Sequence, residues 1–189
     1  MSFLDQILRK RLKRTRTVVT QLDGSRTLVS SEGGEPEVRL SPATSGYVVD
    51  RSPDAIPARV LDNLFVGSQD CCDPDTLIRF GIIAVLSVGV EAPVHAPEGV
   101  TYKFMECLDL PDTSLPELLH ECSLFIEAES KVGGVLVHCN AGVSRSVTIV
   151  VGYLITRLGY DFATAMALVR AARPSAKPNV GFDRQLRLL

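Results

Sequence analysis

Residues 135–158 read VLVHCNAGVSRSVTIVVGYLITRL, and this stretch decides the fold of the chain. Its first residues, Val135–Val137, are typical of a short buried strand. The apolar residues of 144–158 recur at helical spacing and predict a helix. Between the strand and the helix lies a loop that carries a cysteine and an arginine, Cys139 and Arg145. The stretch therefore predicts a strand, a loop and a helix, with a nucleophile and a cation where the helix begins.

A loop that enters a helix N-terminus is suited to binding an oxyanion, because its backbone N–H groups and the helix dipole can both face the ligand. The same field, together with a neighbouring cation, favours the nucleophilic thiolate form of Cys139. The planar guanidinium of Arg145 can bind two oxygens of a phosphoryl group at once. Gly142 permits a tight loop. Ser146 can donate a hydrogen bond to the sulfur, and Ser144 can brace the loop.

The alternative interpretation is that Cys139 is a buried core thiol and Arg145 a surface charge, because free cysteine is among the most buried residue types. For an isolated cysteine and arginine this alternative would be preferred. The neighbours His138, Gly142 and Ser146, in a strand-loop-helix context, favour a functional site instead.

These residues resemble the signature of the cysteine-dependent protein tyrosine phosphatase superfamily, which is His-Cys, five residues, Arg, and then Ser or Thr. The loop sequence Asn-Ala-Gly-Val-Ser is similar to that of the small, atypical dual-specificity phosphatases. The resemblance extends from about Pro57 to the C-terminus and includes LFVGS at 64–68 and PNVGF at 178–182. It is greatest for atypical members that regulate stress-activated protein kinase pathways, whose N-terminal stretch also has a basic segment leading to Gly-Tyr-Val, here at 46–48. The chain ends soon after Phe182, which leaves open whether its last helix is complete.

The resemblance implies a dual-specificity protein phosphatase that hydrolyses phosphotyrosine and phosphoserine or phosphothreonine through a phosphocysteine intermediate. The implied catalytic residues are Cys139, Asp109, Arg145 and Ser146. The implied substrate-binding loop comprises Asn140, Ala141, Gly142, Val143, Ser144 and Arg145. No cofactor and no metal are expected, because His95 and His120 show no ligand spacing with any cysteine.

The mechanism also needs an acid that protonates the leaving oxygen and a base that later activates water. The candidates are Asp109 and Asp112, which both lie in the loop-like stretch LDLPDT at 108–113. From the sequence alone, each is more simply a solvated loop carboxylate. In the resembling family the acid is the eighth residue counted from the aromatic at Tyr102, which selects Asp109 and leaves Asp112 as the alternative.

Two further polar residues are expected to support the loop. The resemblance implies that His138, at the end of the predicted strand, holds the loop and the thiol through hydrogen bonds and transfers no proton. A purely structural histidine is the alternative. Asn179, just after Pro178, caps the last helix or, as the family implies, braces the active-site loop, and the sequence leaves both open.

The chain has 189 residues, is 46% hydrophobic and carries a formal net charge of -2, which is typical of one main domain with a substantial core. No apolar run reaches the roughly 18 to 20 residues that a membrane-spanning helix needs, and the N-terminus has no secretory pattern. The five cysteines are an odd number without disulfide-scaffold spacing, which suits a reducing compartment. We therefore expect a cytoplasmic protein, with a nuclear location as the alternative. The sequence does not indicate an oligomeric state.

The first part of the chain differs in composition from the rest. It predicts a basic N-terminal arm and linker at 1–55 and a catalytic domain at 56–189. Within the arm we expect a short helix near 3–13 and a hairpin around Asp23-Gly24. The segment 28–54 is rich in Ser, Gly and Pro and predicts a linker or a loosely packed arm.

A basic run occupies residues 9–16, where six of eight residues are positively charged. Such a run could attract an anionic membrane, nucleic acid or the acidic docking groove of a mitogen-activated kinase, and a solvated arm is the alternative. The resemblance implies phosphoprotein substrates, namely mitogen-activated or stress-activated kinases or their upstream kinases. The family resemblance implies no nucleic-acid partner.

After residue 57, predicted strands and helices alternate. The expected elements are a hairpin at 60–66, a helix from Asp73-Pro74 to Gly81, strands at 82–88 and 101–107, a helix at 114–131 that begins with a Ser114 and Glu117 capping box, a helix at 161–172 and a last helix from Asn179. This alternation predicts an α/β fold with a central, mostly parallel sheet flanked by helices, similar to that of protein tyrosine phosphatases. Ligands bind such sheets at the carboxyl ends of the strands, where Cys139 is expected.

Two other functions remain open. A lipid or RNA 5'-phosphatase could use the same fold, but lipid members of the resembling superfamily often carry lysines in the loop, whereas Asn140, Ala141 and Val143 add no charge. A phosphopeptide-binding scaffold would normally have lost the cysteine, the arginine or the acid, and this chain retains all of them.

Overall fold

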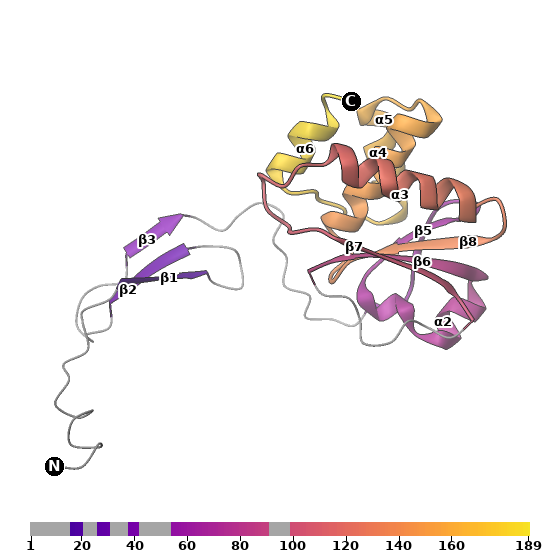
Figure 1. Cartoon of the computed structure of the whole chain (residues 1–189), viewed down its shortest axis with the longest axis horizontal. Helices are drawn as coiled ribbons and strands as arrows, with labels where there is room; N and C mark the ends of the chain where they lie inside the picture. The colour runs from indigo at the N-terminus through magenta and orange to yellow at the C-terminus, as the bar shows by residue number, and fades with distance from the viewer. Residues whose placement is uncertain (1–15, 21–25, 31–37, 42–53, 91–98) are drawn as a thin grey trace, which may run out of the picture. The chain divides into compact units, whose positions relative to one another are not determined.

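The computed structural model describes residues 16–20, 26–30, 38–41, 54–90 and 99–189 (Figure 1). The chain divides into two compact units, Met1–Thr44 and Ser45–Leu189. No helix in the described part of the chain is both long and apolar enough to cross a membrane.

The N-terminal unit contains an antiparallel sheet with the strand order β1-β2-β3. Strands β1 (Arg16–Thr20) and β2 (Arg26–Ser30) pair with Val18 opposite Leu28, which confirms the predicted hairpin. Strand β3 (Val38–Ser41) lies inside the segment that was predicted to be a linker or a loosely packed arm, so the linker prediction was wrong for these residues. Its sequence, VRLS, alternates apolar and polar residues, but the run is too short to stand out from its Gly- and Pro-rich surroundings. The helix expected near 3–13 lies outside the described residues.

The second unit is built on a sheet whose strand order is β4-β5-β8-β6-β7. The strands are β4 (Ala58–Leu61), β5 (Leu64–Gly67), β6 (Ile82–Gly89), β7 (Thr101–Glu106) and β8 (Gly134–His138). Strand β4 is antiparallel to β5, and all other neighbours are parallel, which confirms the predicted mostly parallel sheet. The carboxyl ends of parallel strands meet at one edge, so the residues that follow β5, β7 and β8 come together there.

Helices cover both faces of this sheet (Figure 1). The helices are η1 (Gln69–Cys72), α2 (Pro74–Arg79), α3 (Pro116–Glu129), α4 (Arg145–Leu158), α5 (Phe162–Ala172) and α6 (Val180–Leu186). Strand residues alternate between two apolar clusters, because successive side chains point to opposite faces. Val135 and Val137 join the large cluster under α3 to α6, whereas Leu136 joins a small cluster with Leu77 of α2.

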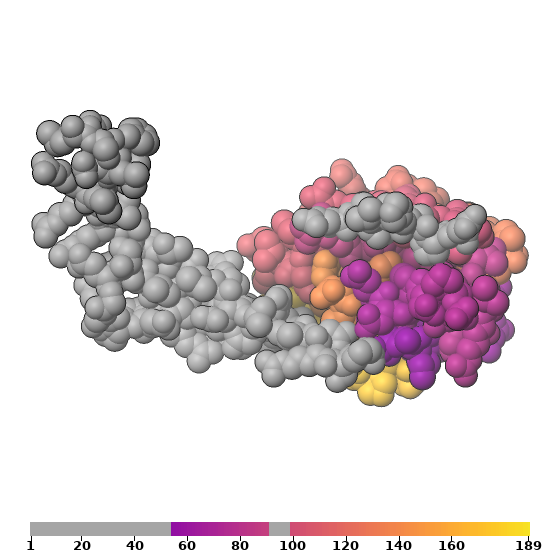
Figure 2. All heavy atoms as spheres, turned by 90° about the horizontal axis from the view of Figure 1, so that it is seen from below, coloured from indigo at the N-terminus to yellow at the C-terminus, as the bar shows by residue number. Residues whose placement is uncertain are grey.

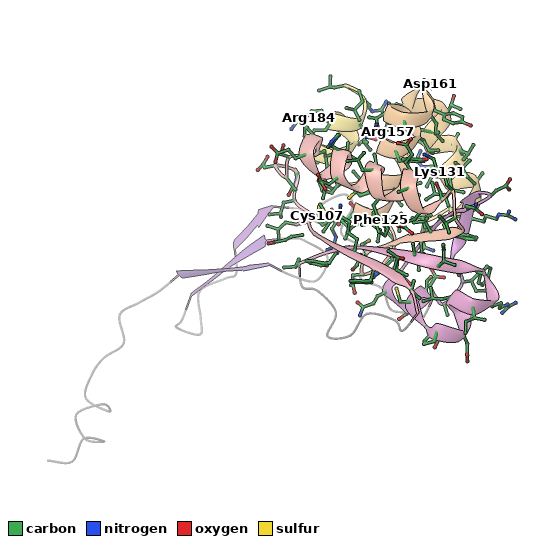
Figure 3. All side chains as sticks on the ribbon, turned by 45° about the vertical axis from the view of Figure 1, so that its right-hand side comes forward. Cys107, Phe125, Lys131, Arg157, Asp161 and Arg184 are labelled. Carbon is green, nitrogen blue, oxygen red and sulfur yellow. The ribbon has the colours of Figure 1, made fainter. Side chains whose placement is uncertain are left out.

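Several predicted helix boundaries are confirmed. Asp73 caps α2 by accepting a hydrogen bond from the Thr76 backbone, and Asp161 caps α5 by accepting one from Thr164 (Figure 3). Helix α4 ends at Gly159, whose φ of 73° is in the left-handed region that glycine tolerates.

The capping box predicted for α3 was wrong. The helix begins at Pro116, and its N-cap residue Leu115 makes no side-chain cap. Proline favours the first helical position and lacks an N–H, so the start of the helix moves past Ser114. The Leu115 N–H instead donates to Oε1 of Gln185, 3.0 Å away in α6.

Candidate active site

The loop between β8 and α4 is held by its backbone carbonyls. The Asn140 carbonyl accepts a hydrogen bond from the Gln69 N–H at 3.0 Å, and the Val143 carbonyl accepts one from the Lys177 N–H at 2.9 Å. In a planar trans peptide unit the C=O and the next N–H point in opposite directions. The N–H groups of Ala141 and Ser144 are therefore directed to the opposite side of the loop, as an oxyanion cradle requires.

Gly142 allows this loop to lie against the end of β5. Its φ is 65°, in the left-handed region. A Cβ atom at this position would also collide with the backbone carbonyl group of Gly67. Only glycine satisfies both conditions without strain.

Cys139 lies at the carboxyl end of β8, immediately before the loop. Its side chain is buried, and its Sγ lies 3.3 Å from Oγ of Ser146 in the first turn of α4. The Ser146 hydroxyl can therefore donate to a thiolate at this position. Figure 2 shows orange atoms that follow β8 at the surface, beside rose atoms that follow β7 and purple atoms near the start of the second unit.

Arg145 begins α4 and carries a buried donor. Among the described residues, its Nε has no hydrogen-bond partner, and the nearest carboxylate oxygen, Oδ2 of Asp109, lies 4.0 Å away. The side chains of Arg145 and Asp109 are only 14% and 19% exposed. A buried N–H donor without a hydrogen-bonded acceptor is costly, so the Nε position of Arg145 favours an anionic ligand.

Asp109 is held at the loop by two short hydrogen bonds. Its Oδ1 accepts from the Ser144 hydroxyl at 2.7 Å and from Nδ2 of Asn179 at 2.7 Å. Asp112 is exposed and takes part in neither contact. Of the two candidate acids, the structure thus brings Asp109 to the loop.

Asn179 makes both of the contacts that the sequence left open. Its Oδ1 caps α6 by accepting from the Gly181 and Phe182 N–H groups, each at 2.9 Å. Its Nδ2 braces Asp109, and its own N–H donates to Oγ of Ser144 at 3.0 Å. One side chain therefore couples the start of α6 to the acid and to the loop.

Replacing Asn179 separates these two effects. We expect Asn179→Ala to lower the free energy of unfolding by about 1 to 2 kcal/mol through loss of the cap. Asn179→Ser keeps a capping oxygen but cannot reach Asp109, so it should retain most of the stability and still lose turnover, by roughly threefold to tenfold. Denaturant unfolding and steady-state kinetics on both variants check this. Equal stability losses in the two variants would contradict the capping role.

His138 is buried at the end of β8. Neither of its ring nitrogens makes a well-aligned hydrogen bond among the described residues, although the backbone of Cys139 lies beside the ring. The supporting role of His138 therefore stays a prediction. Burial lowers the pKa of His138 to about 4, and the nearby backbone of Cys139 opposes this only in part. Because desolvation penalises the charged form, the ring is neutral near pH 7.

A neutral buried histidine makes stability depend on pH. Its pKa is about 4 in the folded chain and 6.5 for an unperturbed side chain, so the unfolded chain binds the proton first on acidification. The stability is complete above pH 6.5 and decreases as the pH falls toward 4, by about 3 kcal/mol at most. Urea unfolding of the wild type and His138→Asn between pH 7 and pH 4 should show a weaker pH dependence in the variant. Parallel curves would contradict the assignment.

A second cysteine, Cys107, lies next to this site, at the end of β7 (Figure 3). Burial raises its pKa to about 12, against the lowering effect of Arg145, while Asp109 and Cys139 raise it further. Cys107 therefore lies within electrostatic range of Arg145, Asp109 and Cys139. With its pKa near 12, Cys107 is a neutral thiol at neutral pH and acts as a packing group, in line with the sequence interpretation.

The sequence interpretation missed the contacts of α6 with the acid loop, which is the segment 107–115 that carries Asp109. Gln185 accepts from the Leu115 N–H at 3.0 Å and donates from Nε2 to the Thr113 carbonyl at 2.9 Å. A Cβ atom on Gly181 would collide with Pro111, so the loop lies directly against this helix. Nothing in the sequence near residue 113 indicates a contact with Gln185. Gly181 could be noticed only as part of the family motif PNVGF.

The fold and this site define a cysteine-dependent phosphatase of the protein tyrosine phosphatase type. The family model described as "Dual specificity phosphatase, catalytic domain" matches residues 64–189. The chain is 38% identical over 185 residues to dual specificity protein phosphatase 19 of Mus musculus, covering 95% of this chain and 84% of that protein. It is 34% identical over 134 residues to MAP kinase phosphatase with leucine-rich repeats protein 3 of Dictyostelium discoideum, covering 70% of this chain and 16% of that protein.

Solved structures agree with the sequence relatives. The crystal structure of DUSP15 superposes with a TM-score of 0.67 at 32% sequence identity, covering 71% of this chain and 87% of that one. The chain therefore belongs to the dual-specificity protein phosphatases, among their atypical members. The predicted family and fold are confirmed.

Proposed function

We propose that this chain hydrolyses phosphotyrosine and phosphoserine or phosphothreonine in proteins, with Cys139 as nucleophile and Asp109 as acid and base. The observation that carries the proposal is the arrangement around the loop. A sulfur lies 3.3 Å from a serine hydroxyl, and a carboxylate held by two hydrogen bonds lies 4.0 Å from Nε of a guanidinium whose side chain is only 14% exposed. These are the groups that phosphoryl transfer to sulfur requires.

In the first step, the Cys139 thiolate attacks phosphorus and a sulfur–phosphorus bond forms as the bond from phosphorus to the leaving oxygen breaks. Asp109 gives its proton to that oxygen, so that an alcohol or phenol leaves instead of an anion. The loop N–H groups and Arg145 stabilise the charge on the remaining phosphoryl oxygens.

In the second step, water attacks the phosphocysteine. The Asp109 carboxylate accepts a proton from this water, a phosphorus–oxygen bond forms, and the sulfur–phosphorus bond breaks. The Ser146 hydroxyl donates a hydrogen bond to the departing thiolate. Inorganic phosphate and the starting form of the enzyme result, with Asp109 protonated again.

Arg145→Lys should lower kcat/KM roughly a hundredfold, because lysine keeps the charge but cannot bind two phosphoryl oxygens in a planar fork. The assay is steady-state hydrolysis of an aryl phosphate. Arg157→Lys is the matched control, since Arg157 lies in the same helix and faces Glu127 at 4.0 Å, away from the loop. An Arg145→Lys variant as active as this control would exclude the bidentate role.

The overall function is tested by substrate class. Turnover of an aryl phosphate and of phosphopeptides should persist with a chelator and stop with vanadate. A phosphoinositide and a 5'-phosphorylated RNA serve as the competing substrates. Faster release of phosphate from either of them would favour the lipid or RNA alternative, and phosphopeptide binding without turnover would favour a scaffold.

We further propose that the substrates are mitogen-activated or stress-activated kinases or their upstream kinases. The name of the Dictyostelium relative, a MAP kinase phosphatase, supports this substrate class. A cytoplasmic location, with the nucleus as the alternative, is part of the same proposal. Capture of phosphorylated kinases by a Cys139→Ser variant tests the proposal, and equal capture of unrelated phosphoproteins would reject it.

A further inference from the structure

Arg173 follows the last residue of α5 and is almost completely buried, with 7% of its surface exposed. Its guanidinium is directed at the loop that follows Cys139. Nε donates to the Gly142 carbonyl at 2.6 Å, and Nη2 donates to the Ala141 carbonyl at 3.0 Å. The planar fork of arginine suits two neighbouring acceptors, which a lysine could not serve together.

The same Nη2 lies 2.6 Å from Oδ2 of Asp54, whose side chain is 36% exposed. Residue 54 is itself firmly anchored. Its N–H donates to Oδ2 of Asp70 at 3.1 Å, and its carbonyl accepts from Oγ of Ser68 at 2.9 Å and from Sγ of Cys71 at 3.1 Å. The Asp54 carboxylate is thus a fixed partner that orients Arg173.

With these contacts, each backbone carbonyl of the loop from residue 140 to residue 143 has a hydrogen-bond donor from outside the loop. The carbonyls of Ala141 and Gly142 are bound by Arg173, and those of Asn140 and Val143 by backbone N–H groups. Every carbonyl from residue 140 to residue 143 is therefore turned outward. By the geometry of the trans peptide, the N–H groups of the residues that follow each carbonyl face the other way. A carbonyl that flipped inward would present a negative dipole to a bound phosphate.

We propose that Asp54 and Arg173 form a positioning pair that keeps the phosphate cradle in its binding conformation. The proposal rests on the proposed phosphatase function, and neither side chain is assigned a contact with substrate. Residue 54 precedes the segment 64–189 that matches the family model. The functional unit therefore includes the stretch just before β4.

The test uses single substitutions in the full chain. Arg173→Lys keeps the charge and the ion pair but loses one carbonyl contact, and Asp54→Asn removes the ion pair while leaving the backbone contacts of residue 54. The matched control is Asp62→Asn, which breaks the exposed Arg59–Asp62 ion pair at 3.0 Å on the β4–β5 turn. The readouts are the dissociation constant of tungstate by calorimetry, kcat and KM for an aryl phosphate, and thermal unfolding.

We expect Arg173→Lys to weaken tungstate binding about tenfold and Asp54→Asn about threefold to tenfold, with kcat/KM falling in parallel. Asp62→Asn should leave all three readouts at their wild-type values. If Arg173→Met folds, adding Asp54→Asn to it should cause no further loss, since the carboxylate acts through the guanidinium. If Arg173→Met does not fold, Arg173→Lys and Asp54→Asn still test the proposal.

Wild-type tungstate affinity in a folded Arg173→Lys variant would overturn the proposal. So would a loss of stability in Asp54→Asn with unchanged tungstate binding, because the pair would then be merely structural. Tungstate binding requires no turnover. A wild-type chain that binds tungstate but hydrolyses nothing would therefore refute the proposed function while leaving the positioning pair testable.

Discussion

Cys139→Ser is expected to reduce phosphatase turnover by on the order of 10⁴-fold or more, since a serine hydroxyl is far less nucleophilic than a thiolate and no other residue replaces it. The variant should still bind phosphopeptides, because the loop N–H groups and Arg145 are unchanged. Initial rates on an aryl phosphate, together with fluorescence-based binding of a phosphopeptide, measure the two properties separately.

The matched control for this variant is Cys72→Ser. Cys72 is half-buried, and burial raises its pKa to about 12, so it is a neutral thiol outside the loop. Its replacement should leave turnover within about twofold of the wild type. Wild-type turnover in Cys139→Ser would show that the nucleophile lies elsewhere.

Asp109→Asn is expected to slow hydrolysis of alkyl phosphates roughly a thousandfold, because an alkoxide needs a proton in order to leave. Aryl phosphates with an acidic phenol should be slowed much less. Asparagine keeps an oxygen that can accept from Ser144 and Asn179, so the loop stays in place. Comparing leaving groups of increasing acidity distinguishes a lost acid from a disturbed site, which would slow all substrates alike.

Asp112→Asn is the control for this experiment, since Asp112 lies in the same loop but is exposed. It should show the wild-type dependence on the leaving group. A steep dependence in Asp112→Asn and a wild-type one in Asp109→Asn would reverse the assignment.

The parts of the structure that the sequence predicted depend on local patterns. The helix starts at Asp73 and Asp161 could be predicted because each of these side chains binds a backbone N–H within one turn of the helix that it begins. The strand-loop-helix order around Cys139 was equally local. The capping box at Ser114 was wrong because Pro116 competes for the helix start and a distant side chain, Gln185, supplies the partner.

The contacts that position the acid and the loop could not be predicted from local patterns. Arg173 reaches carbonyls 31 and 32 residues earlier in the chain, and Asn179 reaches Asp109 across 70 residues. Such contacts depend on how α5 and α6 pack on the sheet, which single-residue patterns do not encode. The family resemblance selected Asp109 as the acid without a physical reason. The hydrogen bonds from Ser144 and Asn179 now supply a reason to prefer it over Asp112.

The hydrogen bonds from Asn179 and Gln185 to the acid loop have a consequence for biosynthesis. Ribosomes make the chain from its N-terminus, so the thiol and the oxyanion loop are translated before Asn179 and Gln185. A nascent chain that lacks these residues has the parts to bind phosphate, but its proton donor Asp109 keeps only the hydrogen bond from Ser144 and loses the one from Asn179. Full chemical competence therefore arises only once the segment that includes α6 has left the ribosome and docked.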